Sequence, residues 1–301
     1  MAPVVVLAGG TGGARLARGM ADVVGDDLTV VANTGDDIEI YGAHVSPDPD
    51  LCTFWLADRI DDRGWGLRDD TFAVMDGLRE LGAEVWFALG DRDLAIGLQR
   101  ARRLAEGARL TETLRELGAA LRIGARVLPM SDDPVRTWVR KDSAWMAFQE
   151  YMIRARAEGP VEEVQLRGAA DAEPSPEVLA ALATARAIVI GPSNPIISIG
   201  PILAVPGMRQ ALLDSPAPVV AVSPIVGGDV LKGPTAAFMR SAGHEPTTAA
   251  IADCYEGLLD GLVADEAVDG LPVLRTDTLL ADAESRRRVA AATLSFAEGL
   301  A

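Results

Sequence analysis

The stretch "VVVLAGGTGGARLARGM", Val4–Met20, decides the fold class of this chain. A short run of apolar, mostly β-branched residues stops at "GGTGG", and a helix-like pattern follows at once. A buried strand, a glycine turn and a helix form the opening unit of α/β sheets. The stretch therefore predicts a strand at Val4–Ala8 that leads through a glycine loop into a helix.

The glycine loop, Gly9–Gly13, predicts a site for a phosphate or another anion. Glycines let the backbone approach a ligand closely, and a helix N-terminus turns N–H groups and positive potential toward it. We therefore take as nucleotide- or phosphate-binding candidates Gly9, Gly10, Thr11, Gly12 and Gly13. The alternative is a purely structural turn. Arg15 is either an added cation at this site or a solvent-exposed side chain.

Two better-known loops do not fit. The P-loop pattern lacks its Gly-Lys-Ser/Thr, and the dinucleotide pattern would place its third glycine on Arg15. The second expected strand ends in Asn33, where a dinucleotide fold has an acid for the ribose. These departures count against an NAD-dependent dehydrogenase.

Short β-rich runs recur along the chain, with helical patterns between most of them. The runs are mostly apolar throughout, which predicts a Rossmann-like α/β fold with a parallel sheet and helices on both faces. The expected helices include Thr71–Leu81, one starting at Ser175–Glu177, and Asp282–Glu298. The expected strands are Val4–Ala8, Leu28–Asn33, Glu84–Leu89, Arg126–Met130, Val161–Arg167, Ala187–Ile190, Val219–Ser223, Leu262–Ala264 and Pro272–Arg275.

The segment Pro134–Pro174 differs from the rest because it is rich in aromatic and charged residues. We expect it to be an inserted helical segment, either a lid over the site or a subdomain. No repeat or low-complexity linker divides the chain, so residues 1–301 are expected to form a single transferase domain with this insertion.

The composition of the chain restricts the kinds of partner that it is expected to bind. The net charge of −16, from 44 acidic and 28 basic residues, argues against binding nucleic acid. No run approaches about 18 apolar residues, so no membrane partner is expected, and the start has no basic signal-peptide region. Cys52 and Cys254 show no disulfide or metal spacing, which favours the cytoplasm.

Acidic residues gather in loops after neighbouring strands, in "NTGDD" from Asn33, "SPDPD" from Ser46 and "LGDRD" from Leu89. Like charges crowded at one sheet edge favour a divalent cation. Oxygen ligands and only two histidines favour Mg²⁺, with Asp48 and Asp50 as candidate ligands. Arg92, between two acids, is either a salt-bridge partner or a cation for an anionic ligand.

Later loops carry hydroxyl and amide groups. "GPSNP" offers Ser193 and Asn194 for a phosphate, a ribose or a base edge. "AVSPIVGGDVLKGP" ends near Lys232, and "LPMSDDPV" contributes Asp132 and Asp133. Turn chemistry alone explains each of these loops when it is taken singly. All of them follow expected strands, however, and such loops lie at the edge of the sheet where a ligand binds.

As an ordered set, these motifs resemble the 2-phospho-L-lactate transferase family of coenzyme F420 biosynthesis. The resemblance runs from residue 4 to about 280. It rests on "GGTGG", "NTGDD", "SPDPD", "LGDRDLA", "LPMSDDPV", "GPSNPIISIGPIL", "PGMR", "AVSPIVGG" and "RTDTLL".

The resemblance implies a homodimeric, Mg²⁺-dependent enzyme that joins a guanosine diphosphate-activated three-carbon acid to the deazaflavin alcohol Fo and releases GMP. It implies that Asp50 and Arg92 bind Fo. The glycine loop, with Asn33, Ser193 and Asn194, would hold the guanosine diphosphate portion. The alanine- and arginine-rich composition resembles the actinobacterial branch, in which the donor is the enolpyruvyl compound that yields dehydro-F420-0; a phospholactyl donor would yield F420-0.

The implied mechanism is a direct attack of the Fo hydroxyl on phosphorus, helped by positioning and charge neutralisation. Asp50 is the catalytic candidate, as metal ligand, hydroxyl contact or base. Replacing it with alanine is expected to abolish turnover and leave the fold intact. The alternative from another class is a regulatory protein of the same superfamily that binds UDP-sugars without catalysis.

Overall fold

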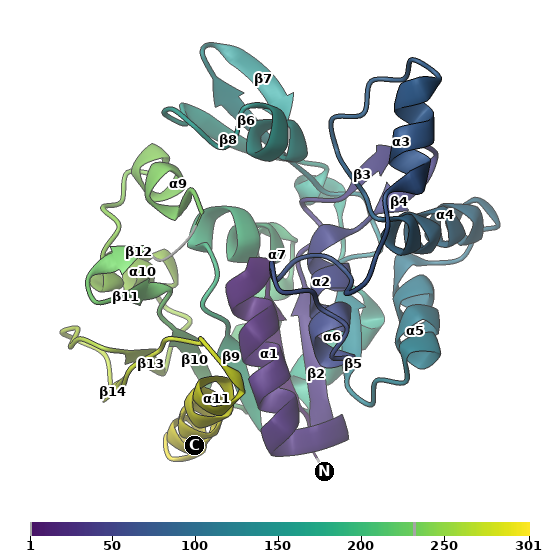
Figure 1. Ribbon diagram of the computed structural model, residues 1–301. Helices are drawn as coiled ribbons and strands as arrows, with labels where there is room; N and C mark the ends of the chain where they lie inside the picture. The colour runs from purple at the N-terminus through teal and green to yellow at the C-terminus, as the bar shows by residue number, and fades with distance from the viewer. Residues whose placement is uncertain (1, 231–232) are drawn as a thin grey trace.

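The computed structural model describes residues 2–230 and 233–301. Its centre is a seven-stranded sheet with every neighbouring pair parallel (Figure 1). The strands are β1 (Val4–Ala8), β2 (Leu28–Ala32), β5 (Arg126–Pro129), β9 (Ala187–Ile190), β10 (Val219–Val222), β13 (Gly261–Ala264) and β14 (Val273–Arg275). Their order across the sheet is β14-β13-β10-β9-β1-β2-β5. The predicted Rossmann-like α/β class is confirmed.

Helices cover both faces of this sheet. The α-helices are α1 (Gly10–Val24), α2 (Pro47–Leu56), α3 (Ala73–Glu80), α4 (Asp91–Ala105), α5 (Leu110–Leu121), α6 (Pro176–Ala183), α7 (Gly200–Ala204), α8 (Met208–Leu213), α9 (Thr235–Ser241), α10 (Thr248–Cys254) and α11 (Ala283–Glu298). The central strands are apolar on both sides, so each face has its own core. In β1, Val4 and Val6 face one core with α1 and α11, whereas Val5 and Leu7 face a second core with α6, α7 and α8.

Shorter elements complete the chain. They are β3 (Ile38–Ile40), β4 (Ala43–Val45), β11 (Ile225–Val226), β12 (Asp229–Val230), η1 (Gly25–Asp27), η2 (Glu150–Arg154), η3 (Ala169–Asp171) and η4 (Pro195–Ile199). The four strands form two hairpins, β3–β4 and β11–β12, in the segments that follow β2 and β10.

The order of the strands sets the position of the site. From β1 the chain moves outward to β2 and β5, and it then returns to place β9 on the other side of β1. The β1/β9 boundary is therefore the switch point of the sheet, and in folds of this class ligands bind at the carboxyl edge beside it. The loop after β1 is the glycine loop, and the loop after β9 is "GPSNP".

The prediction that the inserted segment 134–174 is helical is wrong, because the segment consists mainly of a small β-sheet. It holds a three-stranded antiparallel sheet of β6 (Arg136–Lys141), β7 (Ala144–Ala147) and β8 (Glu163–Arg167), with only the short η2 and η3 helices. In β6, buried Thr137 and Val139 alternate with half-buried Trp138 and Arg140, which is the period of a strand. Figure 1 shows this small sheet standing above the main body at the top of the view.

A second prediction is also wrong: Glu84–Leu89 belongs to no strand of the described chain. The backbone N–H groups of Trp86 and Phe87 donate to the Tyr41 hydroxyl at 3.1 and 3.2 Å instead of to a neighbouring strand. The run predicted at 161–167 is a strand, β8, but it lies in the small sheet. The predicted helices at 71–81, 175 and 282–298 appear as α3, α6 and α11.

Candidate active site

The glycine loop is held tightly against the loop after β9. A Cβ on Gly12 would lie 2.0 Å from the Pro192 carbonyl oxygen, and one on Gly13 would lie 2.7 Å from Ser193 Oγ. Gly9 meets Ser198 in the same way. Packing therefore requires these glycines whether or not a ligand binds. Their number, which suggested a phosphate site, has a structural cause of its own.

Asp48 lies at the N-terminus of α1. Its Oδ1 accepts a hydrogen bond from the backbone N–H of Gly10 at 2.6 Å, and its Oδ2 accepts one from Asn33 Nδ2 at 2.9 Å. The carboxyl is buried, and burial raises its pKa to about 6 although these hydrogen bonds lower it. The chain thus brings together three of the predicted residues, and it fills part of the helix N-terminus with its own carboxylate.

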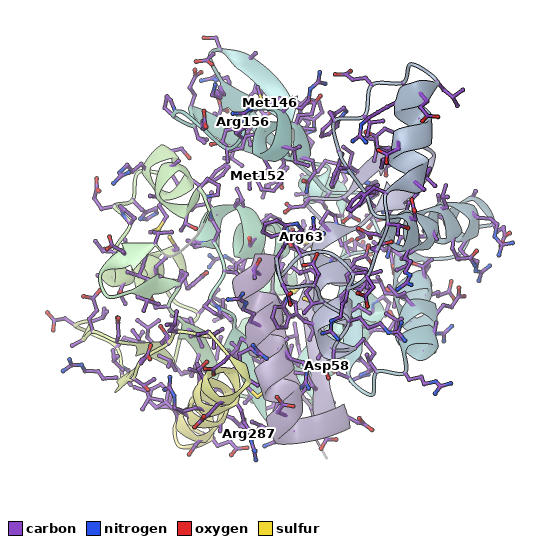
Figure 2. All side chains as sticks on the ribbon, viewed as in Figure 1. Asp58, Arg63, Met146, Met152, Arg156 and Arg287 are labelled. Atoms are coloured by element: carbon purple, nitrogen blue, oxygen red, sulfur yellow. The ribbon has the colours of Figure 1, made fainter. Side chains whose placement is uncertain are left out.

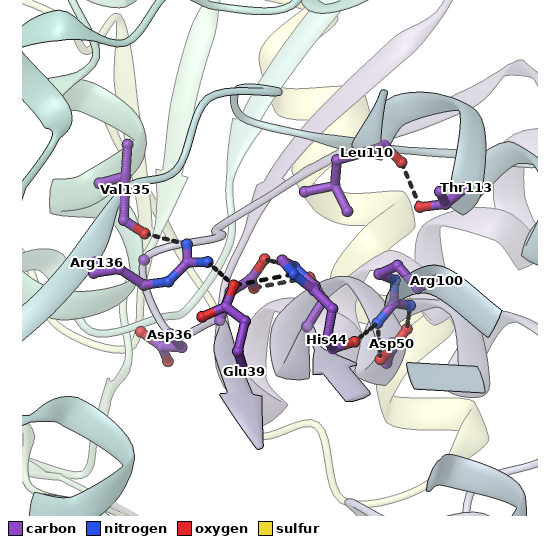
Figure 3. Close-up of polar contacts among 12 residues, drawn as sticks. Asp36, Glu39, His44, Asp50, Arg100, Leu110, Thr113, Val135 and Arg136 are labelled. Atoms are coloured by element: carbon purple, nitrogen blue, oxygen red, sulfur yellow. Dashed lines mark hydrogen bonds and ion pairs between the residues drawn. The ribbon is translucent and has the colours of Figure 1, made fainter. Parts of the chain in front are cut away.

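Asp50 is paired with a residue that sequence reasoning missed. Arg100 Nη1 donates to Asp50 Oδ2 at 3.0 Å, and Nη2 donates to Oδ1. Nη1 also donates to the His44 carbonyl at 3.0 Å, as Figure 3 shows. Both partners are buried, at 4% and 2% exposure. Burial raises the pKa of Asp50 while the charge of Arg100 opposes that rise. Both oxygens of Asp50 are therefore already engaged.

Two cavities open at this edge of the sheet. The first, the glycine-loop cavity, has a volume of about 480 Å³. The second, the aspartate cavity, has a volume of about 680 Å³. Residues that line the glycine-loop cavity include Gly9, Gly10, Thr11, Arg15, Asn194, Ser198, Ser223, Thr235, Thr278 and Leu280. Residues that line the aspartate cavity include Asp48, Asp50, Arg63, Trp65, Asp70, Phe72, Trp86, Phe87 and Asp93.

The cavities share a wall made of Asp36, Phe148 and Met152. Met152 belongs to η2 of the insertion, and Figure 2 labels it together with Arg63 on the loop after α2. Groups bound in the two cavities would thus meet at Asp36. The insertion contributes to both cavities, and its role as a lid stays a prediction.

Asp36, in "NTGDD", is the most notable residue missed among the candidates. It is buried, and its Oδ1 has no hydrogen-bond partner in the described part of the chain. Burial and the charge of Asp48 raise the pKa of Asp36 well above its ordinary value. Its neighbour Asp37 is turned to His44 and Ser46, which contact it at 3.1 and 2.8 Å. The doubled acid in the motif was the available signal.

The carboxylates at this edge of the sheet meet the requirements of a Mg²⁺ site only in part. Within residues 2–230 and 233–301, no three or more His, Cys, Asp or Glu side chains gather as metal ligands. However, Asp36 and Asp48 are buried carboxyls close enough for the charge of one to raise the pKa of the other. The Oδ1 of Asp36, unpartnered among the described residues, is the kind of oxygen that a Mg²⁺ ion with several waters would take. Asp50, expected as a ligand with Asp48, is bound instead to Arg100.

The other predicted residues are placed as follows. Asn194 lines the glycine-loop cavity, while its Oδ1 accepts hydrogen bonds from Ile196 and Ile197 N–H at 2.9 and 3.2 Å and caps η4. Ser193 Oγ accepts a weak bond from Gly9 N–H at 3.4 Å. Arg92 is exposed and lines neither cavity; its Nη1 contacts the Arg68 carbonyl at 3.5 Å.

The two other loops predicted to follow strands, "AVSPIVGG" and "LPMSDDPV", line different cavities. Ser223 reaches the glycine-loop cavity, whereas Asp132 and Asp133 line a separate cavity of about 570 Å³ beside His44. Asp132 also accepts a hydrogen bond from Thr111 N–H at 2.7 Å, in the first turn of α5. Lys232 lies outside the described residues.

The described chain has no helix that is both long and apolar enough to cross a bilayer.

Comparison with known proteins gives consistent matches. Residues 4–289 match the family model described as 2-phospho-L-lactate transferase CofD. A phosphoenolpyruvate transferase of Kitasatospora aureofaciens is 40% identical over 98% of this chain and 98% of its own length. A 2-phospho-L-lactate transferase of Methanosarcina mazei is 39% identical over 95% of this chain and 98% of its own length.

The fold also matches a solved structure. A crystal structure of a UPF0052 family protein from Bacillus halodurans aligns with a TM-score of 0.65 over 98% of this chain and 99% of that one. At 19% identity this likeness concerns the fold alone.

Proposed function

Because the chain belongs to the 2-phospho-L-lactate transferase CofD family, as its motifs predicted, we propose that it catalyses the corresponding step of coenzyme F420 biosynthesis. In this reaction a phosphorylated three-carbon acid moves from its guanosine diphosphate-activated form to the hydroxyl of Fo, and GMP leaves. The observation that carries the proposal is the pair of cavities that meet at Asp36, because a transfer between two bound substrates needs two adjoining sites.

The donor is assigned to the glycine-loop cavity and Fo to the aspartate cavity. The first has helix α1 pointing its N-terminus at it, which suits a diphosphate. The second has Trp65, Phe72, Trp86 and Phe87 in its walls, which suit a flat aromatic ring. Asp50, which lines the same cavity, is the proposed Fo contact, and Arg100 orients it. Arg92 is kept as a proposed Fo contact, because its backbone N–H donates to Asp70, which lines this cavity.

The chemistry requires the Fo hydroxyl to attack the phosphorus nearest the three-carbon acid while the bond to GMP breaks. Asp36 lines both cavities and Asp48 lines the aspartate cavity, so both carboxyls lie near the place where the substrates would meet. We propose that these two carboxylates hold the Mg²⁺ ion. When bound, the ion neutralises the phosphate charge. The hydroxyl proton then passes to a nearby carboxylate of the aspartate cavity or to water.

The three-carbon acid is the open part of the proposal, since the relatives' names differ in it. The experiment therefore incubates the protein with Fo, Mg²⁺ and either the enolpyruvyl or the phospholactyl guanosine diphosphate donor. Mass spectrometry should find dehydro-F420-0 or F420-0 together with GMP. If neither product forms, but UDP-sugars raise the melting temperature and GDP does not, the regulatory alternative holds instead.

We further propose a cytoplasmic homodimer. The cytoplasm is supported by two free cysteines, Cys52 and Cys254, and the dimer by the family resemblance. Sedimentation velocity at micromolar concentration should give about twice the mass of 31.6 kDa.

A further inference from the structure

Arg15 forms no ion pair with a carboxylate among the described residues, although the chain is strongly acidic. It lies on the second turn of α1 and lines the glycine-loop cavity. Its one hydrogen bond within the described residues, from Nη1 to the Leu280 carbonyl, is long at 3.5 Å, and its Nε is buried without a partner. By contrast, Arg18, one turn further on, is bound to Asp58 at 2.9 Å and also to Asp22.

A tryptophan holds the guanidinium in place. The Arg15 Cζ lies 5.4 Å from the Trp55 ring centroid, and the Arg286 Cζ lies 5.0 Å from the same centroid. Burial and the charges of Arg15 and Arg18 lower the pKa of Arg286. Two like charges thus share one indole ring, and neither forms an ion pair within the described chain, an arrangement that an anion would stabilise.

A second, independent group points to the same place. Thr278 lines the glycine-loop cavity and is only 3% exposed, yet its Oγ1 has no hydrogen-bond partner among the described residues. A buried hydroxyl without a partner costs free energy unless a ligand or water satisfies it. Thr278 lies in "RTDTLL", a family motif to which sequence analysis assigned no role. The amides of Thr11 and Gly12, in the first turn of α1, also lack helical acceptors.

We propose that Arg15 and Thr278 form an oxyanion subsite in the glycine-loop cavity that binds an anionic group of the donor. This inference rests on the proposed function, and it adds residues that specify the donor. A planar guanidinium matches both a phosphate and a carboxylate, and a hydroxyl donates to either. The anion is therefore either the diphosphate of the guanosine moiety or the carboxylate of the three-carbon acid, and affinities for different ligands separate these two sources.

The test compares Arg15→Gln and Thr278→Val with wild type by isothermal titration calorimetry. The ligands are GMP, GDP, the enolpyruvyl donor and inorganic pyrophosphate. Arg15→Gln should weaken binding roughly tenfold to a hundredfold, and Thr278→Val roughly threefold to tenfold. A loss seen already with GDP and pyrophosphate assigns the diphosphate. A loss seen only with the full donor assigns the carboxylate.

Matched controls isolate the subsite. Arg18→Gln removes the same charge one turn away on α1, and Thr293→Val removes from α11 a buried hydroxyl that has no partner among the described residues. Both should bind every ligand within about twofold of wild type. Arg15→Lys keeps the charge but loses the planar fork, so it should recover only part of the affinity. Melting temperatures of all variants check that they are folded.

The outcomes separate the two claims. If Arg15→Gln and Thr278→Val bind every ligand as wild type does, the subsite is overturned and the proposed function stands. If wild type binds pyrophosphate through Arg15 but binds GDP no more tightly than pyrophosphate, the subsite stands and the proposal of a guanosine diphosphate donor is overturned. If wild type binds none of the ligands, both are overturned.

Discussion

Arg100, on α4, binds both carboxylate oxygens of Asp50, on α2, within the buried wall of the aspartate cavity. The same guanidinium donates to the His44 carbonyl and so joins the β3–β4 hairpin to both helices (Figure 3). Asp50 thus has a structural partner as well as its proposed contact with Fo. This changes what a substitution at either position should do.

Removing Arg100 should destabilise the protein, because it leaves the buried Asp50 carboxylate without its partner. For Arg100→Gln we expect a loss of about 3–5 kcal/mol in the free energy of unfolding, measured with urea. Arg102→Gln on the same helix, whose ion pair is long and exposed, should change it by less than about 0.5 kcal/mol. By the same reasoning Asp50→Ala leaves Arg100 unpaired, so an unchanged free energy of unfolding in that variant would contradict this account.

Asp93 should make stability depend on pH. Burial and the charge of Asp50 raise its pKa to about 7 in the folded chain. A raised carboxyl pKa stabilises the fold while the group is protonated, and that stabilisation is lost as the pH rises from about 4 through about 7. Asp93→Asn should therefore gain stability relative to wild type between about pH 5 and pH 8. The gain is on the order of a few kcal/mol at pH 8.

The check is urea unfolding of both proteins at about pH 5, 6, 7 and 8, the range over which the group titrates. Asp76→Asn, on the exposed helix α3, serves as the control. A difference between Asp93→Asn and wild type that stays constant over this range would rule out titration of Asp93.

The stabilisation of the protein by Mg²⁺ should depend on Asp36. A ligand that binds only the folded chain raises its stability, by about 2.7 kcal/mol when present at a hundred times its dissociation constant. Magnesium chloride should therefore raise the melting temperature of wild type more than sodium chloride of equal ionic strength. Asp36→Asn should lose this difference and most of its turnover. An undiminished magnesium shift in Asp36→Asn would remove the residue from the ion's site.

Gly12 should tolerate no side chain. In Gly12→Ala the new Cβ would lie 2.0 Å from the Pro192 carbonyl oxygen, which belongs to backbone and has little room to move. We expect a loss of at least about 1–3 kcal/mol in the free energy of unfolding. Gly77→Ala is the matched control. Its Cβ would meet nothing within 4 Å on helix α3, so it should stabilise the chain by about 0.5–1 kcal/mol.

Trp65 should matter for the acceptor and not for the donor. It is 61% exposed and lines the aspartate cavity, so it is available to stack on a flat ring. Trp65→Ala should weaken Fo binding roughly threefold to tenfold, and it should leave GDP affinity and melting temperature nearly unchanged. Equal weakening of both ligands would argue against separate cavities for donor and acceptor.

The amino-acid sequence by itself determined the elements that depend on neighbouring residues. The apolar run Val4–Ala8, the glycine break and the apolar stripe of α1 are local, and the structure has them as predicted. The Ser175 cap of α6 and the Asp282 cap of α11 are local as well. The ordered motifs also identified the family, because that comparison needs no coordinates.

Only the tertiary structure decided which distant residues meet. Arg100 is 50 positions from Asp50, and nothing near either residue specifies the pairing. In the same way, the strand order brings Gly12 to Pro192, and it gives the glycines a packing role that the local pattern does not reveal. In the small sheet only one pairing is distant: β6 and β7 form a local hairpin, whereas β8 pairs with β6 from across the intervening η2 segment. Local propensity acts over a few residues, whereas burial, ion pairing and the convergence of Asp36, Arg15 and Thr278 on one cavity depend on how the whole sheet is wound.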